Sequence, residues 1–420
     1  TGKTTFLHYI RGCLQKEQRQ FMVLAPTGIA AVNAGGQTLH SMFRLPFGPL
    51  LMTDPRFQKK SIPGAVPPEN IYTRFQYWKW KLELLEAIET VIIDEISMVR
   101  SDVLQAIDRL LRVFRNREGE PFGEVQMVLI GDAYQLPPVL KDNEVPILQG
   151  HYRTRFFFGC EAWAEGRFEG HCLFKIYRQT DPEFVGLLNK IRTGNLTIRD
   201  FQLLSERRMV PPEEEGFVNL VTHKRKAEAI NKEELGHIQG ESHTFQASVW
   251  GKFPESSYPM DTELELKVGA QVMVTRNNRD KEVFNGMMGK VTSIEEGEIT
   301  ICIEENDGTH RKVIVEQATW DNIEYKLNKG TGKVEFEVLG SFTQFPLALA
   351  WAITIHKSQG LTFDKVIADV GASFTHGQEY VALSRCRSLE TLFLSSDIKP
   401  SRLGPHPRVE RFYRRMFGAA

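Results

Sequence analysis

Residues Thr90 to Arg115 have the sequence TVIIDEISMVRSDVLQAIDRLLRVFR. The β-branched run from Val91 to Ile93 predicts a central strand that is covered on both faces. Asp94 and Glu95 stand at its carboxyl end, where open α/β sheets bind ligands. Apolar residues then recur at helical spacing from Val99 to Phe114, so we expect the acidic pair to lead directly into a helix that packs on the sheet. Alone, such a pair is more often a solvated strand end.

The first residues, TGKTT, match the last part of the phosphate-binding pattern G-x-x-x-x-G-K-[ST]. Gly2 lets backbone N–H groups approach phosphates, Lys3 supplies a positive charge, and Thr4 offers a hydroxyl to Mg²⁺, with Thr5 beside it at a helix start. Together with the Asp-Glu pair, this predicts a nucleotide site in which one carboxylate holds Mg²⁺ and the other orients an attacking water. Because the pattern starts inside the loop, we expect its first glycine and the preceding strand to lie upstream of Thr1.

The composition is that of an ordinary globular protein. The 420 residues are 41% hydrophobic and 25% charged, and at roughly 150 residues per domain they allow two or three domains. No apolar run approaches the ~20 residues of a membrane span, so we expect no membrane partner. A net charge of −1 means that a nucleic acid would need a local basic groove. Five cysteines without a C-x-x-C pair predict free thiols in a reducing compartment.

The segment Pro26 to Phe43 follows a second predicted strand, Phe21 to Ala25. It predicts a short helix that ends at Gly35 and Gly36. Its small residues let a polyanion backbone approach main-chain N–H groups, and a turn-rich connector is the alternative. The candidate side-chain donors to a nucleic acid are Thr27, Thr38, His40 and Ser41.

Residues 44–80 carry prolines at positions 46, 49, 55, 63, 67 and 68, which predicts a small insertion of loops. Aromatic residues gather at its end, and basic residues such as Lys59 lie nearby. Stacking on unpaired bases and a satellite core under long loops are both consistent with this cluster, which comprises Tyr72, Phe75, Tyr77, Trp78 and Trp80.

Residues Val125 to Val139, VQMVLIGDAYQLPPV, predict another strand and the loop at its carboxyl end. Gln135 in that loop has the same strand-end placement as Asp94. A neutral amide there can touch both a γ-phosphate and an attacking water, and the rigid Pro137-Pro138 pair can pass on a change in that contact. Gln135 is therefore a candidate sensor residue.

These motifs occur in the order of the motifs of superfamily 1 helicases, together with YRQTD (Tyr177 to Asp181), AITIHKSQGLTFDKV (Ala352 to Val366) and YVALSRCRS (Tyr380 to Ser388). The residues from Ile96 to Arg115 resemble the signature of the Pif-type (petite integration frequency) helicases, relatives of the RecD type. The resemblance covers nearly the whole chain. It implies an α/β fold with two RecA-like P-loop motor domains, which are parallel sheets flanked by helices.

The resemblance also implies a division of the chain. Residues 1–43 and 81–170 would form the first motor domain, with 44–80 as its insertion, and residues 171–239 and 346–400 the second. Residues 240–345 alternate in the strand period, with turns at Asn285-Gly286, Glu296-Gly297 and Asp307-Gly308. We expect them to form a small antiparallel barrel, which similarity to the family suggests is SH3-like. Residues 401–420 are expected to form a basic, solvated closing helix.

Two arginines resemble those that reach the γ-phosphate from the second motor domain. We expect Arg178 just beyond a short strand, Cys172 to Tyr177, and Arg385 on the helix after the strand Lys365 to Val370. Surface arginines usually form ion pairs of little consequence. Across a cleft from Lys3, however, an arginine that neutralises transition-state charge can change the rate by ~10³ to 10⁵. ATP would then close the cleft and hydrolysis would open it.

The segment before Gly360 resembles the family motif that touches both the nucleic acid and the nucleotide, and Gly360 is a candidate nucleotide contact. The candidate DNA contacts in this segment are Thr354, His356, Lys357 and Ser358. His223 and Lys224, after the predicted strand Phe217 to Thr222, are expected phosphate contacts on the same track. A solvated helix start is the alternative for both segments.

The resemblance implies an ATP-dependent DNA helicase that moves 5′ to 3′ on single-stranded DNA and unwinds tailed or structured duplexes, with ATP and Mg²⁺ as cofactors. RNA and RNA–DNA hybrids are alternative substrates. A P-loop nucleotide kinase, a P-loop NTPase without unwinding activity and a non-catalytic nucleic-acid binder are the rivals. We expect a monomer, in the cytoplasm of a bacterium or in the nucleus or mitochondrion of a eukaryote.

In the implied roles, Lys3 and Thr4 hold the phosphates and Mg²⁺, Asp94 holds Mg²⁺ through water, Glu95 polarises the attacking water, Gln135 senses it, and Arg178 and Arg385 stabilise the departing charge.

Overall fold

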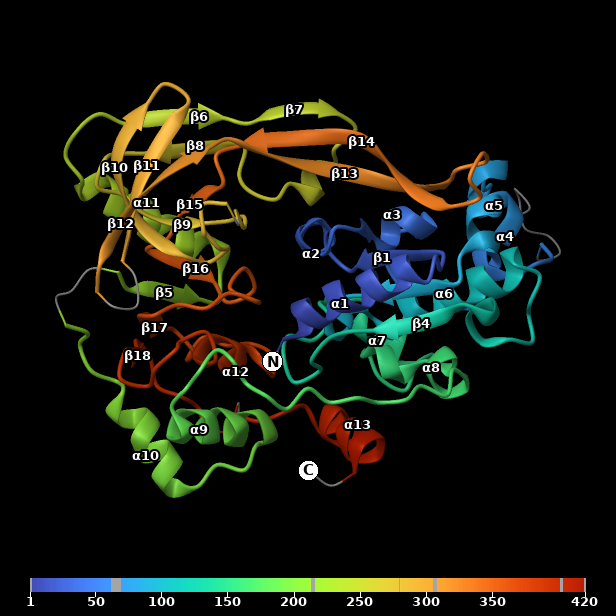
Figure 1. The fold of residues 1–420 in the computed structure, drawn as a ribbon. Helices are drawn as coiled ribbons and strands as arrows, with labels where there is room; N and C mark the ends of the chain where they lie inside the picture. The colour runs from blue at the N-terminus through green and yellow to red at the C-terminus, as the bar shows by residue number, and fades with distance from the viewer. Residues whose placement is uncertain are drawn as a thin grey trace.

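The computed structural model describes residues 2–61, 69–212, 216–278, 280–304, 308–400 and 403–418. It has two lobes, each built on a four-stranded parallel sheet with helices beside it (Figure 1). The first sheet has the strand order β2-β1-β3-β4. Its strands are β1 (Phe21–Ala25), β2 (Gln37–Thr38), β3 (Thr90–Ile93) and β4 (Gln126–Leu129). Every residue of β3 is buried, which confirms the central strand predicted from its β-branched run.

Helices pack around the first sheet, and their starts and ends follow local sequence signals. The predicted helix after Pro26 is confirmed: the Thr27 side chain caps it, and Gly35, at φ 62°, ends it. The main helices of this lobe are α1 (Lys3–Lys16), α2 (Gly28–Ala34), α3 (Leu39–Phe43), α5 (Lys79–Ala87), α6 (Ser101–Phe114), α7 (Val145–Gln149) and α8 (Glu161–Glu165).

The acidic pair does not lead directly into a helix, and this expectation was wrong. Glu95 has φ 50°, a 3-10 turn follows at Ile96–Met98, and α6 begins only at Ser101. The Ile96 N–H donates to the carbonyl of Ile130, just after β4, at 3.0 Å. The chain therefore crosses to the neighbouring strand before the helix starts, and the detour keeps both carboxylates at the edge of the sheet.

The insertion at 44–80 is mainly part of the core. It contains the 3-10 turn η1 (Pro55–Phe57) and the short helix α4 (Ile71–Phe75). Phe57, Phe75 and Tyr77 belong to the main hydrophobic core of the first lobe. Phe75 and Tyr77 therefore pack into the main core rather than into a separate satellite core, and they are not free to stack on bases, whereas Trp78 is 66% exposed. The prolines at 63, 67 and 68 lie outside the described residues.

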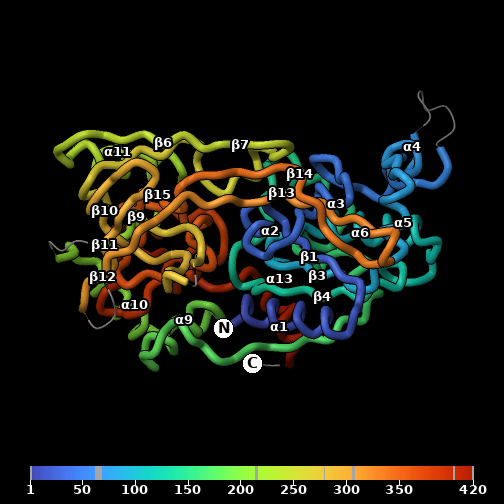
Figure 2. The backbone as a smooth tube through the Cα atoms, turned by 45° about the horizontal axis from the view of Figure 1, so that its top comes forward, coloured from blue at the N-terminus to red at the C-terminus, as the bar shows by residue number. Residues whose placement is uncertain are grey.

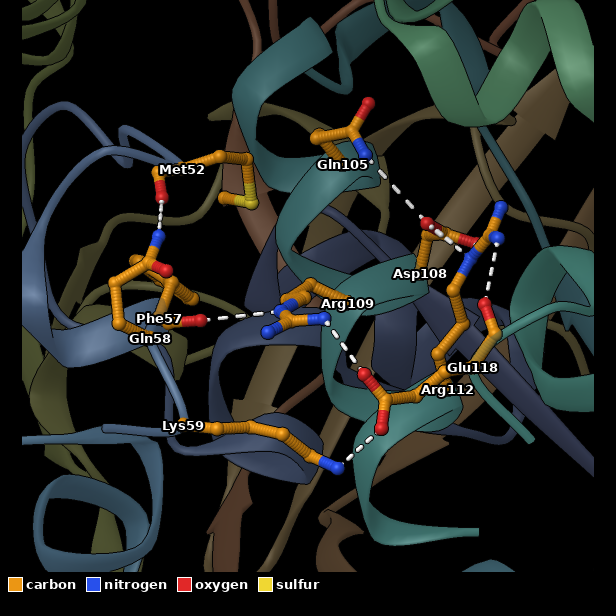
Figure 3. Close-up of polar contacts among 9 residues, drawn as sticks. All are labelled: Met52, Phe57, Gln58, Lys59, Gln105, Asp108, Arg109, Arg112 and Glu118. Atoms are coloured by element: carbon orange, nitrogen blue, oxygen red, sulfur yellow. Dashed lines mark hydrogen bonds and ion pairs between the residues drawn. The ribbon is translucent and has the colours of Figure 1, made fainter. Parts of the chain in front are cut away.

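Polar contacts also tie this insertion to α6 (Figure 3). Arg109 Nε of α6 donates to the Phe57 carbonyl at 3.1 Å. The Glu118 carboxylate pairs with both Arg109 and Lys59. Lys59 is therefore engaged within the first lobe rather than offered to a nucleic acid.

The second lobe has a parallel sheet in the order β16-β5-β17-β18. Its strands are β5 (Val218–Val221), β16 (Ala352–Thr354), β17 (Val366–Ala368) and β18 (Leu392–Leu394). Its helices are α9 (Pro182–Thr193), α10 (Ile198–Glu206), α11 (Lys224–His237) and α12 (Gln378–Leu383). Across the described residues of both lobes, none of the helices is long and apolar enough to cross a membrane.

The predicted strand Cys172 to Tyr177 is not formed. This segment is extended without a sheet partner, and it carries the chain from the first lobe to the second (Figure 1). Its apolar side chains are exposed, Phe174 by 86% and Tyr177 by 66%. The run of apolar residues resembled a buried strand, but strand spacing alone cannot distinguish a core strand from an exposed connector.

The antiparallel strands expected in the insertion at 240–345 are formed, but they divide between separate sheets. Five antiparallel strands in the order β12-β11-β10-β9-β15 make one sheet, and β6 pairs with β8 beside it. The Glu296-Gly297 turn is confirmed between β10 and β11, whereas Asp307 lies outside the described residues. These strands are β6 (His243–Gln246), β8 (Glu263–Leu266), β9 (Gln271–Val274), β10 (Met288–Glu295), β11 (Glu298–Glu304), β12 (His310–Glu316) and β15 (Leu347–Leu349).

The remaining strands of this insertion lie outside the five-stranded sheet. β13 (Ala318–Leu327) and β14 (Val334–Gln344) form a long hairpin, with β7 (Ser248–Gly251) at its edge. The hairpin reaches across α2 and α3 to α5 of the first lobe (Figures 1 and 2). The alternating residues of β14 were expected within the barrel, as part of 240–345, and they form one strand of this hairpin instead.

The chain returns to the first lobe at its C-terminal end. α13 (Pro407–Phe417) packs there with Val409 buried in the first core, while Phe412 and Tyr413 lie against the same core. The expectation of a solvated closing helix was therefore wrong for one face of α13. Its arginines, such as Arg414 and Arg415, are on the exposed side, and Arg402 is outside the described residues.

Candidate nucleotide site and nucleic-acid track

The predicted phosphate loop leads into α1, whose first residue is Lys3. Gly2 precedes it with φ 77°, a left-handed conformation that glycine adopts at little cost. Thr4 and Thr5 are exposed at the first turn. The free N–H groups and the positive end of the helix dipole make this helix start suited to an anion.

Lys3 lies close to both predicted carboxylates. Burial raises the pKa of Asp94, and the positive charge of Lys3 acts in the opposite direction. Burial likewise raises the pKa of Glu95, again opposed by Lys3 and reinforced by the negative charges of Asp94 and Asp132. The sequence prediction that the helix start and the acidic pair form one site is thus matched by their proximity in space.

Thr4 and Asp94 are suited to Mg²⁺ by the chemistry of their donors. Both offer oxygen, the ligand that Mg²⁺ prefers, and Mg²⁺ commonly uses one or two protein oxygens and completes its shell with water and phosphate. Asp94 Oδ1 accepts a hydrogen bond from the Glu95 N–H at 2.9 Å, which orients the carboxylate. Among the described residues there is no cluster of three or more His, Cys, Asp or Glu side chains that could hold a metal without such outside ligands.

Gln359 connects the two lobes at this site. It lies in the second lobe, and its Nε2 donates to Glu95 Oε2 at 2.9 Å and to Gln135 Oε1 at 3.3 Å, both in the first lobe. The sequence placed Gln359 within a motif but gave it no role. Gln359 directly precedes Gly360, which has φ 83°, and its polar side chain in this motif was the available signal.

We call the contact of the two lobes around Glu95, Gln135 and Gln359 the seam. The two predicted arginines lie together on its second-lobe side. Arg385 is 2% exposed and donates from Nε to the Val381 carbonyl at 2.8 Å. Arg178 donates from Nε to Thr362 Oγ1 at 2.7 Å and from Nη2 to the Gly360 carbonyl at 3.3 Å.

Their electrostatics link them to each other and to the first lobe. Burial and the nearby Arg178 lower the pKa of Arg385 to about 9, while Glu95 acts in the opposite direction across the seam. Burial also lowers the pKa of Arg178. We had expected Arg385 to lie on the helix after the strand Lys365 to Val370. This expectation was wrong, because α12 ends at Leu383 and Arg385 follows it.

In the first lobe, the residues predicted to contact a nucleic acid make local hydrogen bonds and ring contacts instead. Thr27 Oγ1 accepts from the Ala30 N–H at the start of α2, and Thr38 Oγ1 accepts from the Ser41 N–H at the start of α3. The His40 ring stacks on Phe47 with a centroid distance of 5.7 Å, and burial lowers the pKa of His40. Thr27 lies at the start of the predicted helix, whereas Thr38 and His40 lie at the start of α3, which the sequence had not predicted.

The candidates of the second lobe meet at one aromatic side chain. The rings of His223 and His356 lie 5.8 Å and 6.3 Å from that of Phe374, which is 55% exposed. Phe374 was missed, although an exposed aromatic in the loop after a sheet strand is a usable signal for base stacking.

Four further candidates differ in what they offer. Lys357 is exposed, while Thr354 Oγ1 accepts from the Lys357 N–H at 3.1 Å. Lys224 pairs with Glu228 at 3.1 Å, and that hydrogen bond raises the pKa of Lys224. Ser358 is fully buried and donates to the Ile355 carbonyl at 2.8 Å, so its side chain does not reach the surface.

The two parallel sheets, the phosphate-loop helix with its acidic pair, and the arginines facing them define a class: P-loop proteins with paired RecA-like domains. A family model described as "PIF1-like helicase" matches residues 1–200. A solved structure of Bacteroides sp Pif1 in complex with ADP-AlF4 is 43% identical and covers 99% of this chain and 90% of that one, with a TM-score of 0.87. The chain belongs to the PIF1-like helicase family.

Two other relatives add detail. Bacteroides Pif1 bound to ssDNA is 44% identical and covers 99% of this chain and 91% of that one, with a TM-score of 0.62. The ATP-dependent DNA helicase PIF1 of Xenopus laevis is 32% identical over 99% of this chain. The chain spans 60% of the length of that relative.

Proposed function

We propose that this chain is an ATP-driven DNA helicase. The observation that carries the proposal is the contact of Gln359 with both Glu95 and Gln135. A side chain of the second lobe thereby touches the two first-lobe residues expected to handle the attacking water. Any movement of one lobe against the other changes this contact, so hydrolysis and lobe movement are coupled.

The proposed chemistry is ATP hydrolysis by an in-line attack of water on the γ-phosphate. Mg²⁺ would supply charge neutralisation at the phosphates when bound. Each side chain has a role consistent with its place. Lys3 and Thr4 bind phosphate and metal, Asp94 orients the metal shell, Glu95 accepts the proton of water, Gln135 detects the γ-phosphate, and Arg178 and Arg385 neutralise charge from the second lobe.

The proposed substrate is single-stranded DNA, with movement 5′ to 3′ and unwinding of tailed or structured duplexes. Support comes from the Bacteroides relative, which has been solved with ssDNA, and from the exposed Phe374 and Lys357 near the seam. An RNA or RNA–DNA track uses the same phosphate contacts and stays the alternative. We propose that the motor acts as a monomer.

Two measurements test this function. ATP hydrolysis is measured with and without single-stranded DNA, and we expect a large stimulation because the track and the seam share the Thr354–Gly360 segment. Unwinding is then measured on duplexes with a 5′ or a 3′ tail, and we expect only the 5′-tailed duplex to open. Absence of DNA stimulation would refute a motor, and opening of the 3′-tailed duplex alone would reverse the proposed direction.

A further inference from the structure

The C-terminal helix α13 contacts the predicted sensor loop through one side chain. The Tyr413 hydroxyl donates to Asp132 Oδ1 at 3.2 Å and accepts from the Ala133 N–H at 3.2 Å. Its ring stacks on Tyr134 with a centroid distance of 4.1 Å and an interplanar angle of 22°. Three consecutive residues of the loop are thus held by a helix that lies 280 residues further along the chain.

Tyr413 is itself fixed by the core. Val409, one turn earlier on α13, is 1% exposed. The neighbouring Phe412 stacks on Phe158 at 4.3 Å, with the two rings nearly parallel at 6°. Val409 shares its core with Ala133 and Tyr134 of the loop, whereas Phe412 packs on a residue outside the loop. The helix that carries the Tyr413 hydroxyl therefore has an anchor in the first lobe besides the loop itself.

The Asp132 carboxylate connects Tyr413 to the predicted catalytic groups through hydrogen bonds. Its Oδ2 accepts from Gln135 Nε2 at 3.2 Å. Gln135 Oε1 in turn accepts from Gln359 Nε2, which also donates to Glu95. Carboxylates only accept hydrogen bonds, so Asp132 and Glu95 at the two ends fix which atom of each amide faces which neighbour.

The second lobe closes on the same loop. The Arg192 guanidinium of α9 lies 5.0 Å from the Tyr134 ring centroid. Gly377, at the start of α12, approaches so closely that a Cβ atom there would lie 2.5 Å from the Gln135 carbonyl oxygen. Leu136 of the same loop is buried in the core of the second lobe. The loop therefore sits between a helix packed on its own lobe and several contacts from the other.

We propose that Tyr413 is a positioning residue for ATP hydrolysis, because it fixes the Gln135 amide through Asp132 and so sets the contact of Gln359 with Glu95. This inference rests on the proposed function. It assigns to the C-terminal helix a part in the chemistry of a site formed by residues far from it in sequence.

The first test is the Tyr413→Phe variant, which keeps the ring and removes the hydroxyl. We expect kcat for DNA-stimulated ATP hydrolysis to fall about tenfold, as for loss of a hydrogen bond to a charged group, with little change in the KM for ATP. In a Gln135→Ala background the same substitution should cost nothing further, because the chain of contacts is already broken. An equal loss of kcat in both backgrounds would overturn the inference.

The matched control is Tyr152→Phe. Tyr152 is in the same lobe, and its hydroxyl donates to the Leu50 carbonyl at 2.6 Å, away from the seam. Both variants should lower the thermal midpoint slightly, but only Tyr413→Phe should lower kcat. A fall in kcat for both would reduce Tyr413 to a structural residue.

Amide hydrogen exchange gives a readout that needs no activity. Tyr413→Phe should speed exchange of the Ala133 and Tyr134 amides about tenfold, because the first loses its acceptor and the second donates to Asp132 Oδ1. Tyr152→Phe should leave both unchanged. If the wild-type chain shows no DNA-stimulated hydrolysis, the proposed function fails. If exchange and kcat are both unchanged in Tyr413→Phe, the inference alone fails.

Discussion

Two of the contacts between the lobes differ in chemistry. Around the acidic pair at the seam the contacts are polar, such as Gln359 with Glu95, although Leu136 of the neighbouring loop is buried in the core of the second lobe. The β13–β14 hairpin reaches over to the first lobe (Figure 2). Its contacts there are largely apolar, because Ile323 and Tyr325 are buried in the main core of the first lobe. One hydrogen bond joins them to the sheet, from the Val23 N–H to the Tyr325 hydroxyl at 3.1 Å.

Because the two contacts differ in this way, we expect them to affect different properties of the protein. A hydrogen bond between polar side chains contributes about 1 kcal/mol net and exchanges readily with water. A buried apolar side chain contributes about 1.5–3 kcal/mol through burial alone. We therefore expect substitutions at the seam to change the rate of hydrolysis without unfolding the protein. Substitutions at the hairpin contact should change stability and leave the chemical step largely intact.

The largest expected effect is that of Glu95→Gln at the seam. Loss of the proton acceptor should lower kcat by ~10² to 10⁴, while nucleotide binding persists through Lys3. The thermal midpoint should stay the same or rise, because a neutral amide is less costly to bury than a carboxylate. Single-turnover hydrolysis and nucleotide binding check this, with Glu124→Gln, an exposed carboxylate paired with Arg117, as control. Rapid turnover by Glu95→Gln would remove Glu95 from the mechanism.

The sequence predicted much of the seam because its residues follow strand ends and helix starts. Lys3, Asp94 and Gln135 are placed by local patterns that the sheet topology then brings together. The central strand β3 and the caps of α2 were likewise readable from β-branched runs and glycines. Such signals are local, so one chain is enough to find them.

The hairpin contact could not be predicted in this way. Tyr325 meets Val23, which is 302 residues away in sequence, and no local pattern encodes that pairing. The apolar run Cys172 to Tyr177 misled for the same reason, since its exposure depends on which strands already fill the second sheet. The role of Gln359 also depended on the relative placement of the two lobes.

The second prediction concerns Ile323→Ala on the hairpin. Ile323 is 8% exposed within the first core, and removing three buried carbon atoms should lower the free energy of unfolding by about 2–4 kcal/mol. Denaturant titration measures this. Val338→Ala is a close control, because Val338 pairs with Ile323 across the hairpin but is 37% exposed. Equal losses for the two variants would show that the hairpin contact is not apolar in character.

A pH-dependent effect of intermediate size is expected at Lys81, next to the hairpin. Lys81 is 2% exposed, and burial lowers its pKa from 10.5 to about 8, against the opposing charge of Glu324 on β13. The folded state therefore holds fewer protons than the unfolded state between about pH 8 and pH 10.5. Stability should rise with pH across this window, by on the order of 3 kcal/mol.

The comparison is between the wild-type chain and Lys81→Met, which keeps the length of the side chain. Below pH 8 the wild-type carries the full cost of the buried charge, so Lys81→Met should be the more stable variant there. The difference should shrink as the pH approaches 10.5, where both states of the wild-type lose the proton. A difference that is constant with pH would mean that Lys81 stays charged in the folded protein.

The smallest effect is expected for Tyr325→Phe, which removes only the acceptor of the Val23 N–H. The Tyr325 ring stays buried, so the apolar contact is kept. Val23 is 1% exposed, and its N–H would be left without this acceptor. The free energy of unfolding should therefore fall by about 1–2 kcal/mol. Calorimetry resolves such a shift, and ATP hydrolysis should be unchanged. A large loss of hydrolysis in Tyr325→Phe would break the division between the two contacts, because it would mean that the hairpin also sets the geometry at the seam.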